Sequence, residues 1–412
     1  MWGVASAVLA WRFLPYLTLS PLYVVLVACL SFFLLAGVFN VSVNVVSHFL
    51  KDNTRVGEGP GTPAVAVLYC TYNDFDRGAA SSALRLTYPH LSVWILDDSM
   101  DPGSRRDVDA FAEEASEHGR PVRIVRRSDR KGFKAGAINH VLRLLPPEVR
   151  YVAIVDADEV LAPDFVEGCL RHFTRADVGF VQANHRCTNG SASWFTRYMG
   201  VGVDLHWRHY QRYRNRYGTV NMLGHGALVR RFALPLGRSR ARWYEKMDLL
   251  LPSVSLPGVF VLLAFLAIVH GLQWAGWGLP VFDDPVVMGL GLFASFAPLT
   301  MFVDLWRRPV FALKAVVLNT VAYLGLVPVS VHGLLLGVAR PAEFLVTPKG
   351  ARGPLCVCKA AFDTRLEIAF GMTLLGLGVA TLGPWGLVSP IAVVALLAPL
   401  LMVVSRRSLP AT

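Results

Sequence analysis

Long apolar runs and a single extended polar stretch divide the chain, and this pattern predicts two kinds of structure. The apolar run at 21–46 exceeds the roughly 20 residues that a helix needs to cross hydrocarbon. Polar and charged positions then dominate from Lys51 to about Arg242, and apolar runs return from 250 onward. We therefore expect an N-terminal transmembrane part over 1–50, a soluble domain over 51–242 and a C-terminal membrane domain over 243–412.

Within the polar stretch, short strand-like runs alternate with helical patterns. The strand-like runs lie at 65–70, 91–96, 122–125 and 151–156, and a helical pattern at 135–145 precedes the last of them. Such alternation predicts an α/β fold with a mainly parallel sheet. Ligands of these sheets bind beyond the carboxyl ends of the strands. Five acids follow the strand-like runs at that edge: Asp74, Asp97, Asp98, Asp156 and Asp158.

The last two acids form a pair around the small Ala157. Residues i and i+2 of a strand point to the same face, so Asp156 and Asp158 are expected side by side. Their oxygens suit Mg²⁺ or Mn²⁺, which usually shares its ligand shell with phosphate oxygens. The pair therefore predicts a divalent ion and a nucleotide-diphosphate ligand, although an isolated pair of this kind is more often a solvated strand end.

The C-terminal apolar runs predict about four spans, at 250–272, 285–305, 366–382 and 385–404. A further run at 310–338 precedes a basic loop at 340–365. We expect this run to form a re-entrant or interfacial helical pair, because a single crossing would carry the basic loop to the far side. Arg307 and Arg308 are expected on the cytoplasmic side, with the soluble domain. Arg12 interrupts the apolar run at 1–19, so the sequence leaves undecided whether this run is a second N-terminal membrane crossing.

Composition agrees with a membrane protein. The chain is 54% hydrophobic with a mean hydropathy of +0.44, which excludes a soluble globular enzyme. Arginines in loops beside apolar spans explain the net charge of +11, so we expect no nucleic-acid partner. The six cysteines have no regular spacing, which predicts free thiols in a reduced compartment.

Six short motifs follow one another across the polar stretch: TYND at 71–74, LDDS at 96–99, KGFKAGAIN at 131–139, VDAD at 155–158, VQ at 181–182 and GHGA at 224–227. In their order and spacing the chain resembles the membrane-bound family 2 glycosyltransferases, which include cellulose and hyaluronan synthases. The segment FLVTPK at 344–349 is similar to the gating-loop motif of the cellulose synthases.

This resemblance implies a GT-A-like nucleotide-sugar-binding domain joined to a multi-span α-helical membrane domain. It implies a donor site made by Thr71, Tyr72, Asp74, Asp97, Asp98, Lys134, Gly136 and Asp156. It implies a site for Mg²⁺ or Mn²⁺ at Asp158 and Asp156, and an acceptor side made by Gln182, Gly224, His225 and Gly226. The gating-type loop would present Phe344, Val346, Thr347 and Lys349.

The resemblance fails at the general base. The family takes that base from an acidic motif a few tens of residues beyond the Gly-rich loop, followed by a Gln-x-x-Arg-Trp motif. Here no Asp or Glu lies between Asp204 and Glu245, and the chain passes from Pro235 almost directly into the basic segment that begins at Arg238. The segment that carries the base is therefore missing after about Pro235, and the sequence identifies no catalytic residue of this kind.

Taken together, the motifs predict an inverting glycosyltransferase. It would move a sugar from a nucleotide-diphosphate donor to a growing polysaccharide or a lipid acceptor at the cytoplasmic face of the inner cell membrane, among membrane lipids and with or without polymer translocation. Two alternatives stay open: a catalytically impaired remnant that binds nucleotide sugar or serves as a membrane scaffold, and a non-processive lipid-linked sugar transferase. A transporter is disfavoured because the spans carry few polar residues. The sugar and the nucleotide are not readable.

Overall fold

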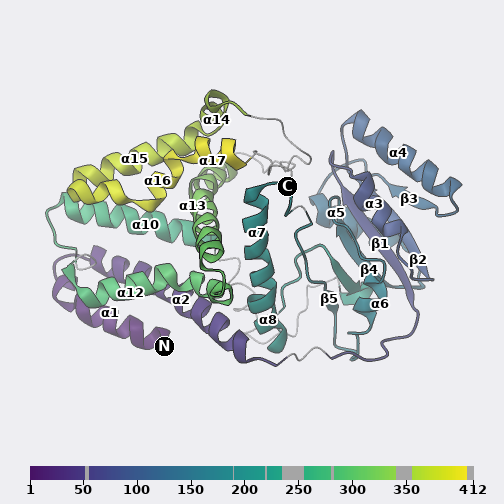
Figure 1. Cartoon of the computed structure of the whole chain (residues 1–412), viewed down its shortest axis with the longest axis horizontal. Coiled ribbons are helices and arrows are strands. Elements are labelled where there is room, and N and C mark those ends of the chain that lie inside the picture. The colour runs from purple at the N-terminus through teal and green to yellow at the C-terminus, as the bar shows by residue number, and fades with distance from the viewer. Residues whose placement is uncertain are drawn as a thin grey trace.

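The computed structural model describes residues 1–51, 55–188, 190–218, 220–233, 255–279, 283–339 and 355–405. An α/β domain stands on one side and a bundle of apolar helices on the other, with helix α7 between them (Figure 1). The gating-type motif at 344–349 and the segment 234–254, which holds Glu245, lie outside the described residues.

The α/β domain is built on one six-stranded sheet with the order β3-β2-β1-β4-β6-β5. Its strands are β1 Ala64–Thr71, β2 Leu91–Asp97, β3 Val122–Val125, β4 Val149–Asp156, β5 Phe180–Gln182 and β6 Ala227–Arg230. β1 pairs in parallel with β2 and β4, and β2 with β3, whereas β6 runs antiparallel to β4 and β5. The expected mainly parallel α/β fold is confirmed. The central strands are continuous apolar runs because helices cover both of their faces.

Two helix layers enclose the sheet. One hydrophobic core joins a face of the sheet to α3 (Arg77–Leu84), α4 (Pro102–Glu117) and α6 (Phe165–Leu170), and a second core joins the opposite face to α5 (Phe133–Leu144). Aspartates start the first two helices: Asp76 accepts a hydrogen bond from Ala79 N and Asp101 from Ser104 N. These caps fix the points at which the chain leaves the strand ends.

A second helical segment leaves the sheet and packs on the apolar bundle. It consists of α7 (Trp194–Leu205), the π-helix η1 (His206–Gln211) and α8 (Arg212–Arg216). Trp194 Nε1 donates to Val404 O at 3.1 Å, and Asn319 Nδ2 donates to Tyr198 O at 3.1 Å. The two parts of the protein are therefore joined by specific side-chain hydrogen bonds.

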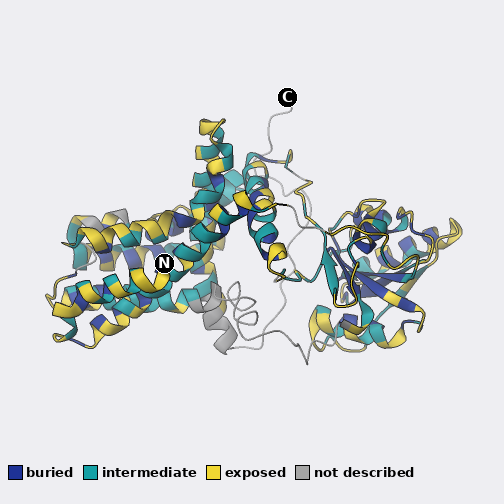
Figure 2. Ribbon diagram, turned by 90° about the horizontal axis from the view of Figure 1, so that it is seen from below, coloured by how far each residue is buried: buried dark blue, intermediate teal, exposed yellow. Residues whose placement is uncertain are grey.

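The apolar part contains helices of unequal length. Its elements are α1 Trp2–Leu17, α2 Leu22–Phe49, α10 Ser255–Trp274, α12 Pro285–Phe296, η5 Ala297–Leu305, α13 Pro309–Ala339, α14 Val357–Asp363, α15 Arg365–Leu382, η6 Gly383–Val388, α16 Pro390–Leu396 and α17 Ala398–Ser405. Within the described residues, four helical stretches are long and apolar enough to cross a membrane: Leu22–Phe49, Pro285–Leu305, Pro309–Val331 and Arg365–Leu382. Large apolar side chains such as Val24, Val310 and Leu313 are exposed on this part (Figure 2), as a lipid-facing surface requires.

Two expectations about the apolar part are corrected. Residues 310–338 were expected to form a helical pair, but α13 is one continuous helix of 31 residues with Pro328 inside it. An apolar helix tolerates such a proline when its neighbours satisfy the freed backbone groups. Residues 385–404 were expected to form one span, but the chain is divided there into η6, α16 and α17, with Pro390 at the first turn of α16. The division into soluble and membrane domains stays a prediction.

Candidate active site

The carboxyl ends of β1, β2 and β4 lie level with one another. Thr71 of β1 is opposite Asp97 of β2, and Cys70 is opposite Asp156 of β4. The loops that follow these strands therefore start from the same edge of the sheet, which is where the sequence predicted a ligand site.

The loop after β1 holds Asp74 in place. Asp74 Oδ1 accepts from Thr71 Oγ1 at 2.9 Å and from Tyr72 N at 2.7 Å. The Arg130 guanidinium carbon lies 3.3 Å from the centroid of the Tyr72 ring. The same loop is tied to the next one through Asn73, whose left-handed backbone (φ 55°) lets its Oδ1 accept from Met100 N at 2.9 Å. Thr71, Tyr72 and Asp74 thus belong to one hydrogen-bonded turn at the predicted edge.

The two acids after β2 have different surroundings. Asp97 is 1% exposed and accepts from Ser99 N at 3.0 Å and from Arg126 Nε at 2.7 Å. Asp98 is half-buried and accepts from Arg127 Nε at 3.0 Å. The side chain of Asp97 is fully buried and that of Asp98 is 8% exposed, so each acid after β2 is held by an arginine. Sequence analysis missed both arginines, which directly follow strand β3.

The start of α5 brings a lysine onto the same edge. Lys134 Nζ forms an ion pair with the Asp156 carboxylate and donates to Gly224 O at 2.7 Å. A Cβ at position 136 would lie 2.0 Å from Lys131 O, so only glycine fits the close approach of this carbonyl to the helix. Lys134 and Gly136 therefore lie where the sequence expected them, and the lysine links the strand edge to the Gly-rich loop.

The Asp-x-Asp pair does not lie on one strand face. Strand β4 ends at Asp156, which is half-buried, and the chain then turns through buried Ala157 to exposed Asp158. The strand ends at Asp156, as expected; Ala157 packs in the core that contains α6, and Asp158 lies in the turn rather than on the strand. Both carboxylates still stand at the carboxyl end of β4, and Asp158 is the more accessible of the two.

A carboxylate and two imidazoles form a cluster beside this edge. Glu159 Oε1 lies 3.2 Å from His185 Nε2, and Glu159 Oε2 lies 3.7 Å from His225 Nδ1. The two histidine rings are stacked with centroids 4.5 Å apart. A Cβ at position 226 would lie 2.1 Å from His185 Nε2, so Gly226 permits the approach. Sequence analysis missed Glu159 and His185, although an acid directly after an Asp-x-Asp motif was a visible signal.

Charge coupling governs the protonation of this cluster. Burial raises the pKa of Glu159, but its close contacts with His185 and His225 outweigh burial and lower that pKa to about 2. The contact with Glu159 in turn raises the pKa of His225 above its ordinary value, against the opposing effect of burial. Glu159 is therefore an anion at neutral pH. The three side chains can serve proton transfer or act as ligands of a metal ion.

Gln182 fixes the Gly-rich loop that carries His225. Its Nε2 donates to His225 O at 2.8 Å and to Gly226 O at 3.0 Å, and its Oε1 accepts from Leu223 N at 3.0 Å. All of the predicted acceptor-side residues are therefore in one hydrogen-bonded unit that also reaches Lys134 through Gly224.

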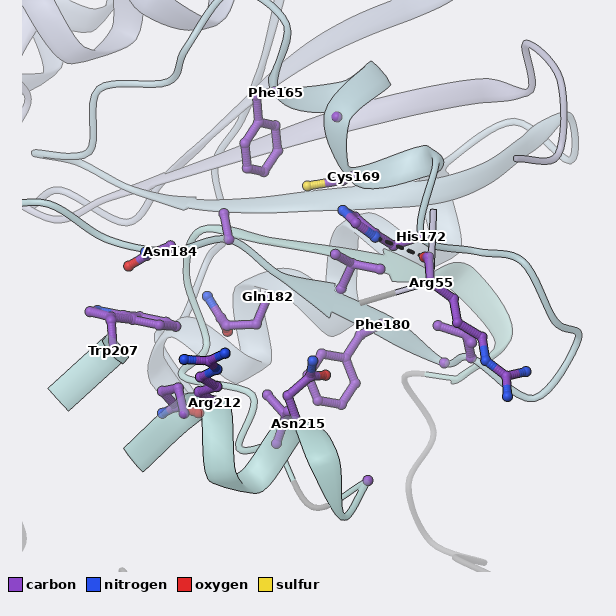
Figure 3. A pocket seen from close by; sticks show the side chains of 18 of the residues that line it. Arg55, Phe165, Cys169, His172, Phe180, Gln182, Asn184, Trp207, Arg212 and Asn215 are labelled. Carbon is purple, nitrogen blue, oxygen red and sulfur yellow. Dashed lines mark hydrogen bonds between the residues drawn. The ribbon is translucent and has the colours of Figure 1, made fainter. Parts of the chain in front are cut away.

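A cavity of about 1410 Å³ adjoins this unit, between β5 and the segment η1–α8 (Figure 3). Amide side chains line it together with an aromatic ring and arginines: Gln182, Asn184, Gln211, Asn215, Trp207, Arg186, Arg208 and Arg212. Trp207 meets His185 edge to face, with centroids 5.0 Å apart. Of the predicted site residues, Gln182 lines this cavity and the predicted donor residues do not.

The edge offers separate groups for separate parts of one ligand. Carboxylates accept hydrogen bonds from hydroxyl or imide groups, lysine and arginine bind phosphate, and exposed carboxylates bind a divalent ion. The cavity offers amides and an aromatic face, which together suit a polar ring compound.

Comparison with known proteins agrees with these features. Residues 67–235 match the family model described as "Glycosyl transferase family 2". The chain is 29% identical over 218 residues to a probable glucomannan 4-beta-mannosyltransferase 15 of Arabidopsis thaliana, a match that covers 48% of this chain and 41% of the relative. It is 32% identical over 179 residues to a beta-monoglucosyldiacylglycerol synthase of Trichormus variabilis, covering 42% of this chain and 36% of the relative.

A solved mannosyltransferase from Pyrobaculum calidifontis, in complex with GDP-Man and Mn²⁺, covers 91% of this chain with a TM-score of 0.39 and 17% identity. The matched part of the chain spans about two fifths of the length of the two curated relatives. The match at 67–235 spans the motifs at 71–227 and confirms the resemblance inferred from them.

Proposed function

We propose that this protein is an inverting glycosyltransferase that moves a sugar from a nucleotide-diphosphate donor to a polysaccharide or lipid acceptor at the cytoplasmic face of a bacterial or archaeal cell membrane. One observation carries the proposal: Asp74, Asp98, Lys134 and Asp156 reach the same edge of a parallel sheet from four separate elements. This edge lies within the family 2 glycosyltransferase domain.

Each of these groups binds a different part of the nucleotide-sugar donor. Asp74 and Asp98 bind the base and ribose, because a carboxylate accepts hydrogen bonds from imide and hydroxyl groups. Lys134 binds the diphosphate, with Lys131 and Arg127 close to it at the start of α5. The Lys134–Asp156 ion pair keeps the ammonium at the edge before the donor arrives.

The carboxylates at the end of β4 suit a hard divalent ion. Asp158 and Asp156 would hold Mg²⁺ or Mn²⁺, since both supply carboxylate oxygens at the end of β4. When bound, such an ion neutralises the charge that develops on the departing diphosphate. The protein's own cations at Lys134 and Arg127 contribute to the same neutralisation.

The reaction needs a group that accepts the proton of the acceptor hydroxyl. The hydroxyl oxygen forms a bond to C1 of the sugar, the C1–oxygen bond to the diphosphate breaks, and the diphosphate keeps the electron pair. We assign the proton to His225, whose ring stands on the acceptor side and is held by Glu159. In the family this loop position carries a small or hydroxyl residue. The chain therefore departs from the family pattern in two places, at His225 and in the missing acidic segment.

The acceptor is assigned to the cavity between β5 and η1. Trp207 offers an aromatic face to a sugar ring, and the surrounding amides offer donors and acceptors to its hydroxyls. The names of the two curated relatives refer to different molecules, one to glucomannan and the other to monoglucosyldiacylglycerol, so both a polysaccharide and a lipid acceptor stay candidates.

A second candidate function is a donor-binding remnant without turnover. The absence of any acid between Asp204 and Glu245 favours it, because the family's base would lie in that part of the chain. The experiment that separates the two is nucleotide-sugar turnover by the purified protein in detergent. Uridine and guanosine diphosphate sugars are tested with Mg²⁺ and Mn²⁺, and donor binding is measured in parallel. Turnover supports the transferase, whereas binding without diphosphate release supports the remnant.

A further inference from the structure

Three side chains from elements far apart in the sequence meet where the helical bundle joins the α/β domain. His48 lies near the end of α2, His209 in the π-helix η1, and Asp304 near the end of η5. His48 Nε2 is 2.8 Å from Asp304 Oδ1, and His209 Nε2 is 2.8 Å from Asp304 Oδ2. The two imidazole rings are stacked with centroids 4.6 Å apart.

The opposite nitrogen of each ring is held by an acceptor. His48 Nδ1 lies 2.6 Å from the backbone oxygen of Asn44, which can only accept, so this nitrogen carries a hydrogen. His209 Nδ1 lies 2.7 Å from Ser47 Oγ, and Ser47 Oγ donates its own hydrogen to Asn44 O at 2.7 Å. The serine oxygen then accepts from His209 Nδ1. In the neutral rings, both Nε2 atoms direct lone pairs toward the same carboxylate.

We propose that His48, His209 and Asp304 bind a divalent transition-metal ion of the Zn²⁺ type. Two imidazole nitrogens and one carboxylate oxygen are a common zinc set, and hydrogen bonds from Nδ1 to protein acceptors are the usual second layer of such sites. The ligand atoms all lie within 4.8 Å of one another. Ligands of a tetrahedral Zn²⁺ stand about 3.3 Å apart, so an outward shift of about half an ångström by Asp304 admits the ion.

Burial and charge suit a site with one open position. The side chain of His209 is 4% exposed and that of Asp304 is 18% exposed, while that of His48 is 38% exposed. Water can therefore complete the coordination from the His48 side. Arg208 Nη1 lies 3.3 Å from Asp304 Oδ2 and competes with the metal for this oxygen, but the arginine side chain is 60% exposed and free to withdraw into solvent.

The ion would join three elements into one unit. Without the ion, two neutral histidines would direct their lone pairs at a negatively charged carboxylate, which is repulsive. Two protonated histidines would instead stack two positive charges against each other. With the ion, α2 and η5 are fixed to the π-helix η1, which also carries Trp207 in the cavity wall. π-helical segments are frequent at functional sites, and here the segment lies between the proposed metal and the cavity. The metal inference does not depend on the proposed function.

The test is zinc stoichiometry on the full chain in detergent, purified without a polyhistidine tag, treated with a chelator and reloaded with Zn²⁺. The metal content after gel filtration is compared among wild type, His48→Gln, Asp304→Asn, His185→Gln, which tests the Glu159 cluster as a separate site, and the matched control His118→Gln, which removes an exposed histidine at the end of α4. We expect His48→Gln and Asp304→Asn each to lose one zinc equivalent relative to wild type, with at least about a hundredfold weaker Zn²⁺ binding. We expect His118→Gln to keep that equivalent.

A further variant separates a metal site from a hydrogen-bonded ion cluster. His48→Cys cannot reproduce both hydrogen bonds of the imidazole, but its thiolate is a zinc ligand. We expect His48→Cys to retain the zinc equivalent and, after loading with Co²⁺, to gain a thiolate-to-cobalt absorption band that wild type lacks. Equal zinc content in wild type, His48→Gln and Asp304→Asn would overturn the proposal and leave an ion cluster without a metal. Zinc content that falls only in His185→Gln would overturn it as well.

Discussion

His225 Nδ1 lies 3.7 Å from Oε2 of Glu159, so the loop residue that departs from the family pattern stands against a carboxylate that sequence analysis overlooked. This pairing raises the pKa of His225. The pKa of the proposed proton acceptor is therefore above the ordinary histidine value, and the pH dependence of turnover should show this.

The first prediction concerns the pH dependence of turnover. His225 accepts a proton only when neutral, so the rate should rise with pH through the raised pKa of this residue. Glu159→Gln removes the charge that raises the pKa, so the rising limb should move to lower pH. His225→Gln should lower turnover by about 10²-fold to 10⁴-fold and abolish the limb. His118→Gln, at the exposed end of α4, is the control; an unchanged profile in Glu159→Gln would contradict the assignment.

The second prediction concerns the acceptor cavity. Trp207→Ala removes the aromatic face and should raise the KM for the acceptor about tenfold, roughly 1.4 kcal/mol, while the KM for the donor stays near the wild-type value. Trp207→Phe keeps a ring and should recover most of the affinity. Initial rates with each substrate varied in turn measure both constants. An equal loss for donor and acceptor would mean that the cavity does not bind the acceptor selectively.

The third prediction concerns the start of α5. Gly136→Ala places a Cβ 2.0 Å from Lys131 O, so the backbone must shift, and we expect a loss of about 1–3 kcal/mol in the free energy of unfolding. Gly168→Ala in α6 meets nothing within 4 Å and should be neutral or stabilising by about 0.4–1 kcal/mol. Thermal unfolding of wild type and both variants in the same detergent tests this prediction. Equal stability of the two variants would show that position 136 does not require glycine.

The fourth prediction concerns thiol reactivity. Burial raises the pKa of Cys169 and of Cys70 to about 12, so both thiols stay protonated at pH 8. Cys356 and Cys358 are exposed. Alkylation of the folded protein should modify the exposed pair rapidly and should reach Cys70 and Cys169 only after unfolding. Peptide mass spectrometry reads each site, and fast labelling of Cys169 in the folded protein would contradict the observed core.

The sequence predicted the sheet and the donor edge because both depend on local patterns. Continuous apolar runs such as 151–156 mark buried strands, and acids placed directly after them must meet at the carboxyl edge of a parallel sheet. The antiparallel pairing of β6 with β4 and β5 left no such local signal, since four residues carry no direction. The pairing of Asp97 with Arg126 and of Asp98 with Arg127 also left no local signal, because the partners are 29 residues apart.

The clusters around Glu159 and Asp304 could not be read from spacing. Each joins residues that are tens to hundreds of positions apart, and single histidines in apolar helices are most often packed residues. The break of 385–404 into short helices and the continuity of α13 through Pro328 depend on neighbouring helices rather than on local hydropathy. The gating-type motif at 344–349 lies outside the described residues and stays a prediction.

The central claim is that this edge performs metal-dependent sugar transfer, and Asp158→Asn tests it most directly. The substitution keeps the size of the exposed side chain at the end of β4 and removes its charge. The measurement is diphosphate release from uridine and guanosine donors by purified protein with Mn²⁺ or Mg²⁺, beside Asp107→Asn as an exposed control on α4. We expect metal-dependent release by wild type and by the control, and a loss of at least about a hundredfold in Asp158→Asn. Donor binding without release by wild type, or full release by Asp158→Asn, would contradict the account.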